Sequence, residues 1–160
     1  MKKINLHTTL DHFEGIEELP QNDQLLLRQA LEARLRAYAP YSNFGVGCAI
    51  LLEDGTVVEG NNQENAAYPS GLCAERVAIF AVGANHPGKI IKKLAITAGP
   101  LDGSFDKPVP PCGSCRQSIA EFENNQQQPI EILFMGTQGA VMRAGSISDL
   151  LPLIFDRDYL

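Results

Sequence analysis

The placement of three cysteines constrains the fold of this chain more than any other feature of its sequence. Cys112 and Cys115 form a C-x-x-C pair at the predicted start of a helix, where residues three apart lie on the same side of one turn. Cys73 also stands at a predicted helix start, with 38 residues between it and Cys112. If the three thiols serve one site, the chain must fold so that two helix N-termini meet.

The order of the predicted elements indicates an α/β domain. The apolar run 44–52 predicts a buried strand, and Asp54-Gly55 predicts a hairpin turn into the next strand. Because two hairpins interrupt the alternation of helices and strands, we expect one mixed five-stranded sheet with helices on both faces, a three-layer α-β-α sandwich. The predicted helices span about 22–38, 74–85, 112–123 and 148–155, and the predicted strands span 44–52, 56–59, 94–98, 130–135 and 140–143.

The chain has the length of one ordinary domain. Of its 160 residues, 44% are hydrophobic and 20% are charged, so a single core is feasible and disorder is excluded. Residues 1–20 lack sustained periodicity, and we predict that they form an N-terminal extension lying over the body. Residues 21–160 are predicted to form the single domain.

Charge and hydropathy limit the partners of the chain. Thirteen basic and nineteen acidic residues give a formal net charge of −6, which repels nucleic acid and anionic lipid surfaces. The one basic cluster is Lys89, Lys92 and Lys93, which is typical of a solvated sheet edge. No apolar run approaches the roughly 18 residues of a membrane span, and no secretory signal follows Lys2 and Lys3. We therefore expect a soluble cytoplasmic protein that binds neither nucleic acid nor membranes.

The cysteine pattern is compatible with three kinds of site. Cys112 and Cys115 alone could form half of a closed structural zinc site, a redox dithiol, or part of a catalytic zinc site with three protein ligands. A redox dithiol needs no third thiol such as Cys73. A closed site would need Cys48, but this residue lies in an apolar strand, where a small buried thiol is ordinary. We therefore favour one catalytic Zn²⁺ per chain, held by Cys73, Cys112 and Cys115.

Three charged residues next to these cysteines have candidate roles. Glu75 follows Cys73 by two positions, so its carboxyl group can transfer protons beside the metal without binding it. The alternative is a glutamate that only complements the helix dipole. Arg76 and Arg116 each follow a site residue directly and could donate hydrogen bonds to thiolate sulfur, which would offset its negative charge. The alternative for each arginine is a surface ion pair.

Four motifs in the same order resemble those of the cytidine deaminases, the small tetrameric members of the zinc nucleoside and nucleobase deaminases. They are Tyr41-Ser-Asn-Phe-Gly-Val-Gly47, Asn62-Gln-Glu-Asn65, Cys73-Ala-Glu-Arg76 and Pro108-Val-Pro-Pro-Cys-Gly-Ser-Cys-Arg-Gln117. The resemblance extends from about residue 22 to residue 155. Relatives that act on polynucleotides usually carry histidine before Ala-Glu, so Cys73 favours a free nucleoside as substrate.

This resemblance implies roles for residues outside the metal site. Phe44 would pack against the pyrimidine ring, while Asn62 and Glu64 would hydrogen-bond the ribose hydroxyl. Family members form homotetramers with active sites at subunit interfaces, so Phe155 and Tyr68 would lean over the base in their own or a neighbouring subunit. The alternatives are that Phe44 belongs to the core, that Asn62 and Glu64 only solvate a loop, and that Phe155 only fills an interface.

The resemblance implies zinc-dependent hydrolytic deamination of cytidine and 2′-deoxycytidine to uridine and 2′-deoxyuridine, with release of ammonia, as in pyrimidine salvage. Two alternatives stay open. Gln63 stands where an aliphatic residue is commoner in the family, so the substrate could be another cytosine nucleoside such as a nucleoside antibiotic. The chain could also be a non-enzymatic, zinc-stabilised binding module in which Cys48 completes a cage of four thiolates.

Overall fold

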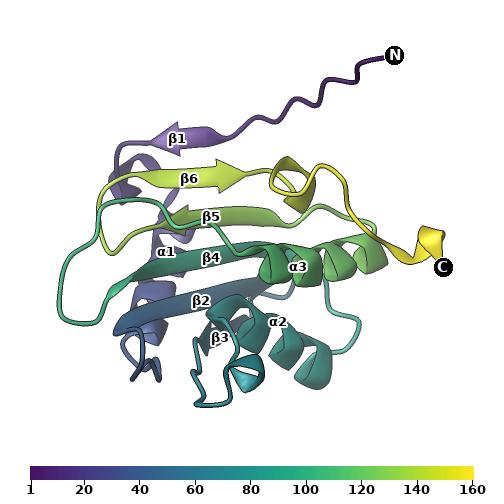
Figure 1. Cartoon of the computed structure of the whole chain (residues 1–160). Coiled ribbons are helices and arrows are strands. Elements are labelled where there is room, and N and C mark those ends of the chain that lie inside the picture. Colours follow the sequence, from purple (N-terminus) through teal and green to yellow (C-terminus); the bar gives the residue numbers. More distant parts are fainter.

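The fold, described by a computed structural model of residues 1–160, is built around one mixed six-stranded sheet in the order β1-β6-β5-β4-β2-β3 (Figure 1). The strands are β1 (Asp11–Phe13), β2 (Phe44–Leu52), β3 (Val57–Asn61), β4 (Ile91–Pro100), β5 (Glu131–Met135) and β6 (Val141–Ala144). The helices are α1 (Gln21–Arg34), α2 (Ala74–Asn85) and α3 (Gly113–Gln126). Short 3₁₀ helices are η1 (Ile16–Glu18), η2 (Tyr68–Ser70), η3 (Ile147–Asp149) and η4 (Arg157–Tyr159).

The sheet has one strand more than the five that we predicted. The additional strand is β1, which residues of the N-terminal extension form by pairing antiparallel with β6. Only β4 and β5 run parallel, because α3 crosses over between them. Three residues are too few to show an alternating pattern, so β1 gave no signal in the sequence.

Alternate residues along the strands face two separate cores, one on each side of the sheet. Ile50, Leu94 and Ile96 belong to the core beneath α2 and α3. Ala49 and Ala95 belong to the core beneath α1, on the opposite face. The predicted three-layer α-β-α arrangement is therefore confirmed, with α2 and α3 on one face and α1 on the other (Figure 1).

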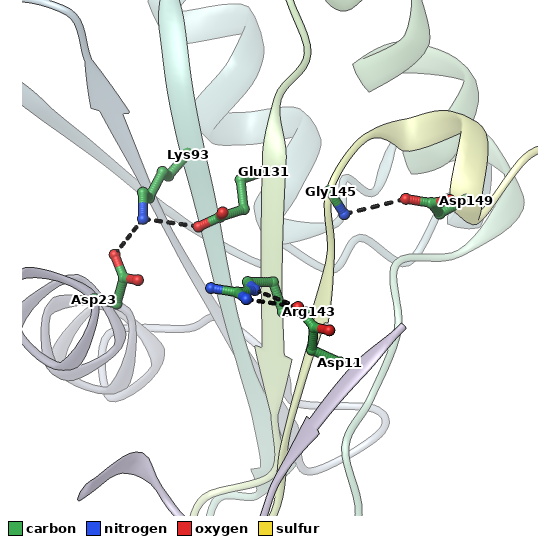
Figure 2. A network of polar contacts seen from close by, with 7 residues as sticks. All are labelled: Asp11, Asp23, Lys93, Glu131, Arg143, Gly145 and Asp149. Carbon is green, nitrogen blue, oxygen red and sulfur yellow. Dashed lines mark hydrogen bonds and ion pairs between the residues drawn. The ribbon is translucent and has the colours of Figure 1, made fainter. Parts of the chain in front are cut away.

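Ion pairs fasten the first part of the chain to the sheet (Figure 2). Lys93 of β4 pairs with Asp23 in the first turn of α1 at 2.6 Å, and with Glu131 of β5 at 2.8 Å. Arg143 of β6 pairs with Asp11 of β1 at 2.6 Å. Because Asp23 is only 2% exposed, Lys93 compensates a buried carboxylate rather than lying on a solvated edge as the sequence indicated.

Three predicted helices differ from the structure, and of these α3 ends at Gln126, three residues after its predicted end. The helix α1 ends at Arg34, four residues before its predicted end. The helix predicted over 148–155 is replaced by η3 and an irregular segment, because Pro152 cannot donate a backbone hydrogen bond. None of the helices has the length and the apolar composition that crossing a bilayer requires.

Candidate active site

The three predicted thiols come together where α2 and α3 begin. Cys73 and Cys112 are the N-cap residues of α2 and α3, and Cys115 lies in the first turn of α3. The sulfur atoms of Cys73 and Cys112 are 3.9 Å apart, those of Cys112 and Cys115 are 3.4 Å apart, and all three lie within 4.8 Å of one another. The fold therefore joins the two helix starts that the cysteine pattern requires.

This donor set fits a zinc ion. In a tetrahedral site with Zn–S bonds of about 2.3 Å, two sulfur atoms are roughly 3.8 Å apart, which falls within the observed range. Three is the number of protein ligands in a catalytic zinc site, whereas a closed structural site needs four. Cys48, the fourth thiol of the chain, is fully buried in β2 and lies outside the cluster. The structure therefore offers no cage of four thiolates.

Positive charge lies beside the sulfur of Cys73. The sulfur atom of Cys115 lies within 4.8 Å of this atom, and the Nη2 atom of Arg76 lies 3.8 Å from it. These two contacts lower the pKa of Cys73 to about 5, against the opposing effect of burial. The N-terminal ends of two helices add partial positive charge at the same place. The cluster is therefore suited to thiolates, the form of cysteine that binds metal.

Arg116 does not contact sulfur as we predicted. Its Nε atom donates to the carbonyl oxygen of Pro111 at 2.8 Å, and its Nη1 atom donates to the carbonyl oxygen of Leu150 at 2.7 Å. Consecutive residues of a helix point about 100° apart, so a side chain next to Cys115 is directed away from the sulfur cluster. Arg116 therefore joins the segment before Cys112 to the chain that follows η3.

Glu75 places a buried carboxyl group beside the sulfur cluster. It lies in the first turn of α2, is only 4% exposed, and is not one of the clustered ligands. Burial raises the pKa of Glu75 to about 6. A carboxyl group with a pKa near neutrality can both accept and release a proton.

A cavity of about 790 Å³ opens onto the cluster. Its volume is in the range of pockets that bind small organic molecules. Its wall contains metal-site residues and four of the five predicted substrate contacts: Cys73, Cys112, Glu75, Arg76, Phe44, Asn62, Glu64 and Tyr68. The fold therefore places these side chains around one space.

Hydrogen bonds hold two polar residues of the cavity wall. The Oδ1 atom of Asn62 accepts from the amide of Val46 at 2.8 Å, and its Nδ2 atom donates to the carbonyl oxygen of Phe44 at 2.9 Å. The carboxylate of Glu64 accepts hydrogen bonds from the hydroxyl and the amide of Ser42, and the hydroxyl contact holds the pKa of Glu64 below its usual value. Asn62 keeps one amide hydrogen for a ligand, and Glu64 keeps free lone pairs.

Phe155, the fifth predicted contact, does not line this cavity. It is 59% exposed, and its ring stacks on that of Tyr159 with the centroids 5.7 Å apart. The Nε2 atom of Gln117 donates to the carbonyl oxygen of Phe155 at 2.7 Å, which ties this segment to α3. Within one chain, the fold does not bring Phe155 to the site.

Phe105 is a neighbour of the site that sequence reasoning missed. It lies in the loop between β4 and α3, and its ring is 5.9 Å from that of Phe44 at an interplanar angle of 83°. A single phenylalanine in an irregular loop has no periodicity to mark it. Val109 and Pro110 also line the cavity, and only their position just before Cys112 could have indicated this.

Comparisons with known sequences agree with this geometry. The family model for the cytidine and deoxycytidylate deaminase zinc-binding region matches residues 20–128. The cytidine deaminase of Halalkalibacterium halodurans is 37% identical over 132 residues, which are 82% of this chain and 92% of that protein. The cytidine deaminase of Sporosarcina psychrophila is 38% identical over 135 residues, which are 84% of this chain and 92% of that protein.

Solved structures give the same result. The crystal structure of cytidine deaminase from Burkholderia pseudomallei matches with a TM-score of 0.71 at 38% identity, over 86% of this chain and 100% of that chain. Cytidine deaminase from Mycobacterium tuberculosis matches with a TM-score of 0.63 at 32% identity, over 82% of this chain and 95% of that chain. The predicted resemblance is thus confirmed, and the chain belongs to the cytidine and deoxycytidylate deaminase family, whose zinc-binding region it carries.

Proposed function

We propose that the protein catalyses the zinc-dependent hydrolytic deamination of cytidine and 2′-deoxycytidine, which yields uridine or 2′-deoxyuridine and ammonia. The observation that carries this proposal is the position of buried Glu75 beside three sulfur atoms, on the wall of a cavity large enough for a nucleoside. The named relatives, which are cytidine deaminases, support the same reaction.

The residues of the cluster divide the chemistry between them. Cys73, Cys112 and Cys115 would hold the zinc ion, which supplies the Lewis acidity that lets water ionise near neutral pH. Glu75 accepts a proton from the attacking water and delivers it to N3 of the pyrimidine, which makes C4 more electron-poor. The same carboxyl group then transfers the second proton to the 4-amino nitrogen, so that ammonia leaves as the C4 carbonyl forms.

Two arginines would support the thiolates in different ways. Arg76 withdraws negative charge from Cys73 through its contact with the sulfur atom. Arg116 acts only through the backbone, because it holds the carbonyl group of Pro111 next to Cys112.

Four residues of the cavity wall would orient the nucleoside. Phe44 would pack against the pyrimidine ring, and Asn62 and Glu64 would hydrogen-bond the 3′-hydroxyl group. Tyr68, which is 76% exposed at the cavity, would cover the base. Both nucleosides are expected as substrates because both carry the 3′-hydroxyl group.

The position of Phe155 supports a further part of the proposal, a homotetramer with active sites at subunit interfaces. Phe155 is exposed and lies outside the cavity of its own chain, so it can contact a substrate only in another copy. We place this assembly in the cytoplasm, as part of pyrimidine salvage. Sedimentation equilibrium would measure the mass, and a monomer with full activity would refute the tetramer.

The decisive experiment follows the loss of the cytidine absorbance band during incubation with the zinc-loaded protein, with and without a chelator. Glu75→Gln should keep zinc but lose most of the turnover, whereas Glu121→Gln, on the exposed side of α3, should retain both. Full activity of the Glu75→Gln variant would overturn the proposal. Asn62→Ala should weaken the binding of cytidine more than the binding of free cytosine, and an equal loss of binding for both would refute the ribose contact.

A further inference from the structure

Phe44, the cavity residue proposed to pack against the base, has an aromatic neighbour outside the cavity. The ring of Phe105 contacts it nearly at right angles, with a centroid distance of 5.9 Å and an interplanar angle of 83°. Phe105 itself does not line the cavity, so it contacts Phe44 from outside the ligand space. An edge-to-face arrangement of this kind is a preferred geometry for two aromatic rings.

The backbone of Phe105 is fixed to the turn between β5 and β6. Its amide donates to the hydroxyl oxygen of Thr137 at 2.7 Å. Its carbonyl oxygen accepts from the amide of Thr137 at 2.7 Å and from the amide of Gln138 at 3.2 Å. The hydroxyl group of Thr137 also donates to this carbonyl oxygen at 3.2 Å, so four hydrogen bonds hold the backbone of Phe105 in a defined position.

Close packing at two glycines restricts Phe105 further. A Cβ atom at Gly136 would lie 2.2 Å from the carbonyl oxygen of Phe105, and one at Gly99 would lie 2.9 Å from its Cβ atom. The loop, the turn and the end of β4 therefore meet with no room for a side chain at either glycine. Phe105 cannot shift toward the sheet, so its ring contacts Phe44 from a fixed backbone position.

Three further contacts hold the backbone of Phe44. Its carbonyl oxygen accepts from Asn62, its amide donates to the hydroxyl oxygen of Ser42, and it pairs with Pro100 of β4. These contacts set the place where the side chain begins but do not act on the ring. The contact with Phe105 restricts the rotation of the ring.

We propose that Phe105 is a positioning residue for the pyrimidine base: it sets the plane of the Phe44 ring, and Thr137 holds Phe105 in place. The inference rests on the proposed function, because it assigns the support behind the surface that the base would contact. A correctly oriented ring improves binding of a flat aromatic base without taking part in the proton transfers. Loss of Phe105 is therefore expected to raise KM while kcat stays nearly constant.

Steady-state kinetics with cytidine test this inference. Phe105→Leu keeps an apolar side chain but removes the ring, and it should raise KM about 3- to 10-fold with kcat within about twofold of wild type. Phe105→Tyr should restore the wild-type KM. Thr137→Val keeps the shape but removes the acceptor for the Phe105 amide, so it should raise KM by about 2- to 3-fold. The matched control is Phe122→Leu. This variant changes an aromatic residue that packs against the core beneath α2 and α3, and it should leave KM unchanged.

A double variant separates positioning from a general loss of structure. If Phe105 acts through Phe44, the Phe44→Leu/Phe105→Leu variant should have the KM of Phe44→Leu alone. An additive rise in KM, an unchanged KM in Phe105→Leu, or a parallel loss of zinc and kcat would each overturn the inference. Wild-type turnover of cytidine is measured first: its absence refutes the proposed function and this inference together, whereas an active wild type with an unchanged Phe105→Leu variant refutes the inference alone.

Discussion

The contact between Gly60 of β3 and the start of α2 leads to a prediction about metal binding. A Cβ atom at Gly60 would lie 2.6 Å from the carbonyl oxygen of Ala74 and 2.6 Å from the amide nitrogen of Ala78. Both atoms belong to the backbone of α2, so neither can rotate away. Gly60→Ala therefore has to push the helix off the sheet.

The size of this displacement can be worked out from the structure. Ordinary van der Waals contact begins at 3.4 Å, so the helix must retreat by roughly 0.8 Å from a contact of 2.6 Å. Because Cys73 is the N-cap residue of α2, its sulfur atom moves with the helix. Zinc–ligand distances tolerate only about ±0.2 Å, so we expect zinc affinity to fall about 10-fold or more. Overpacking should also lower the free energy of unfolding by about 1–3 kcal/mol.

Zinc competition with a chromogenic chelator measures the affinity, and urea unfolding with excess zinc and with chelator measures the stability. The matched control is Gly113→Ala, which makes the same change next to Cys112 at a position where a Cβ atom meets nothing within 4 Å. Gly113→Ala should bind zinc like the wild type and unfold at the same or a slightly higher urea concentration. If Gly60→Ala bound zinc as tightly as Gly113→Ala, the close approach of α2 to β3 would not control the position of Cys73.

Three further predictions concern contacts outside the cluster. Lys93→Met should lower the free energy of unfolding by about 2–3 kcal/mol because Asp23 stays buried without its cation; unchanged urea unfolding would show that the pair is not needed. The Ser42 hydroxyl lowers the pKa of Glu64 below its ordinary value of 4.5. This contact therefore stabilises the folded protein fully above pH 4.5, and the stabilisation is lost as the pH falls through the lowered pKa. An NMR titration should therefore give a midpoint below 4.5 that Ser42→Ala raises, and an identical midpoint in both proteins would contradict the assignment. Arg116→Met should speed amide hydrogen exchange in the segment after η3, and unaltered exchange there would mean that its hydrogen bonds do not hold this segment.

The metal site could be predicted from the sequence because its signals are local. Cys73 and Cys112 each precede an apolar periodic segment, and Pro110-Pro111 marks where α3 can begin. The long strand β2 was recognisable from its continuous apolar run. For these elements, neighbouring residues alone determine the backbone, so the structure agrees with the expectation.

Other features depend on contacts between distant parts of the chain and gave no local signal. The strand β1 forms only because β6 presents an unpaired edge and Arg143 pairs with Asp11. Arg116 adjoins Cys115 in the sequence, but the helix directs it to backbone carbonyl groups far along the chain. Phe105 comes to Phe44 only through the turn near Thr137, 32 positions later. The sequence neighbours of Arg116 were misleading, and those of Phe105 gave no signal, because the contacts of both residues depend on tertiary packing.

The use of cysteine at two N-cap positions shows that the helix starts serve the site at the expense of helix stability. Cys73 and Cys112 have the extended backbone of an N-cap residue, but neither side chain accepts a hydrogen bond from its helix. Serine or aspartate at such a position typically stabilises a helix by about 1 kcal/mol relative to a residue that cannot cap. Without that capping bond, the amide groups of the first turn and the positive end of each helix dipole remain directed toward sulfur. Because three thiolates carry more negative charge than one divalent cation can neutralise, this field and Arg76 supply the remaining compensation that a stable cluster requires.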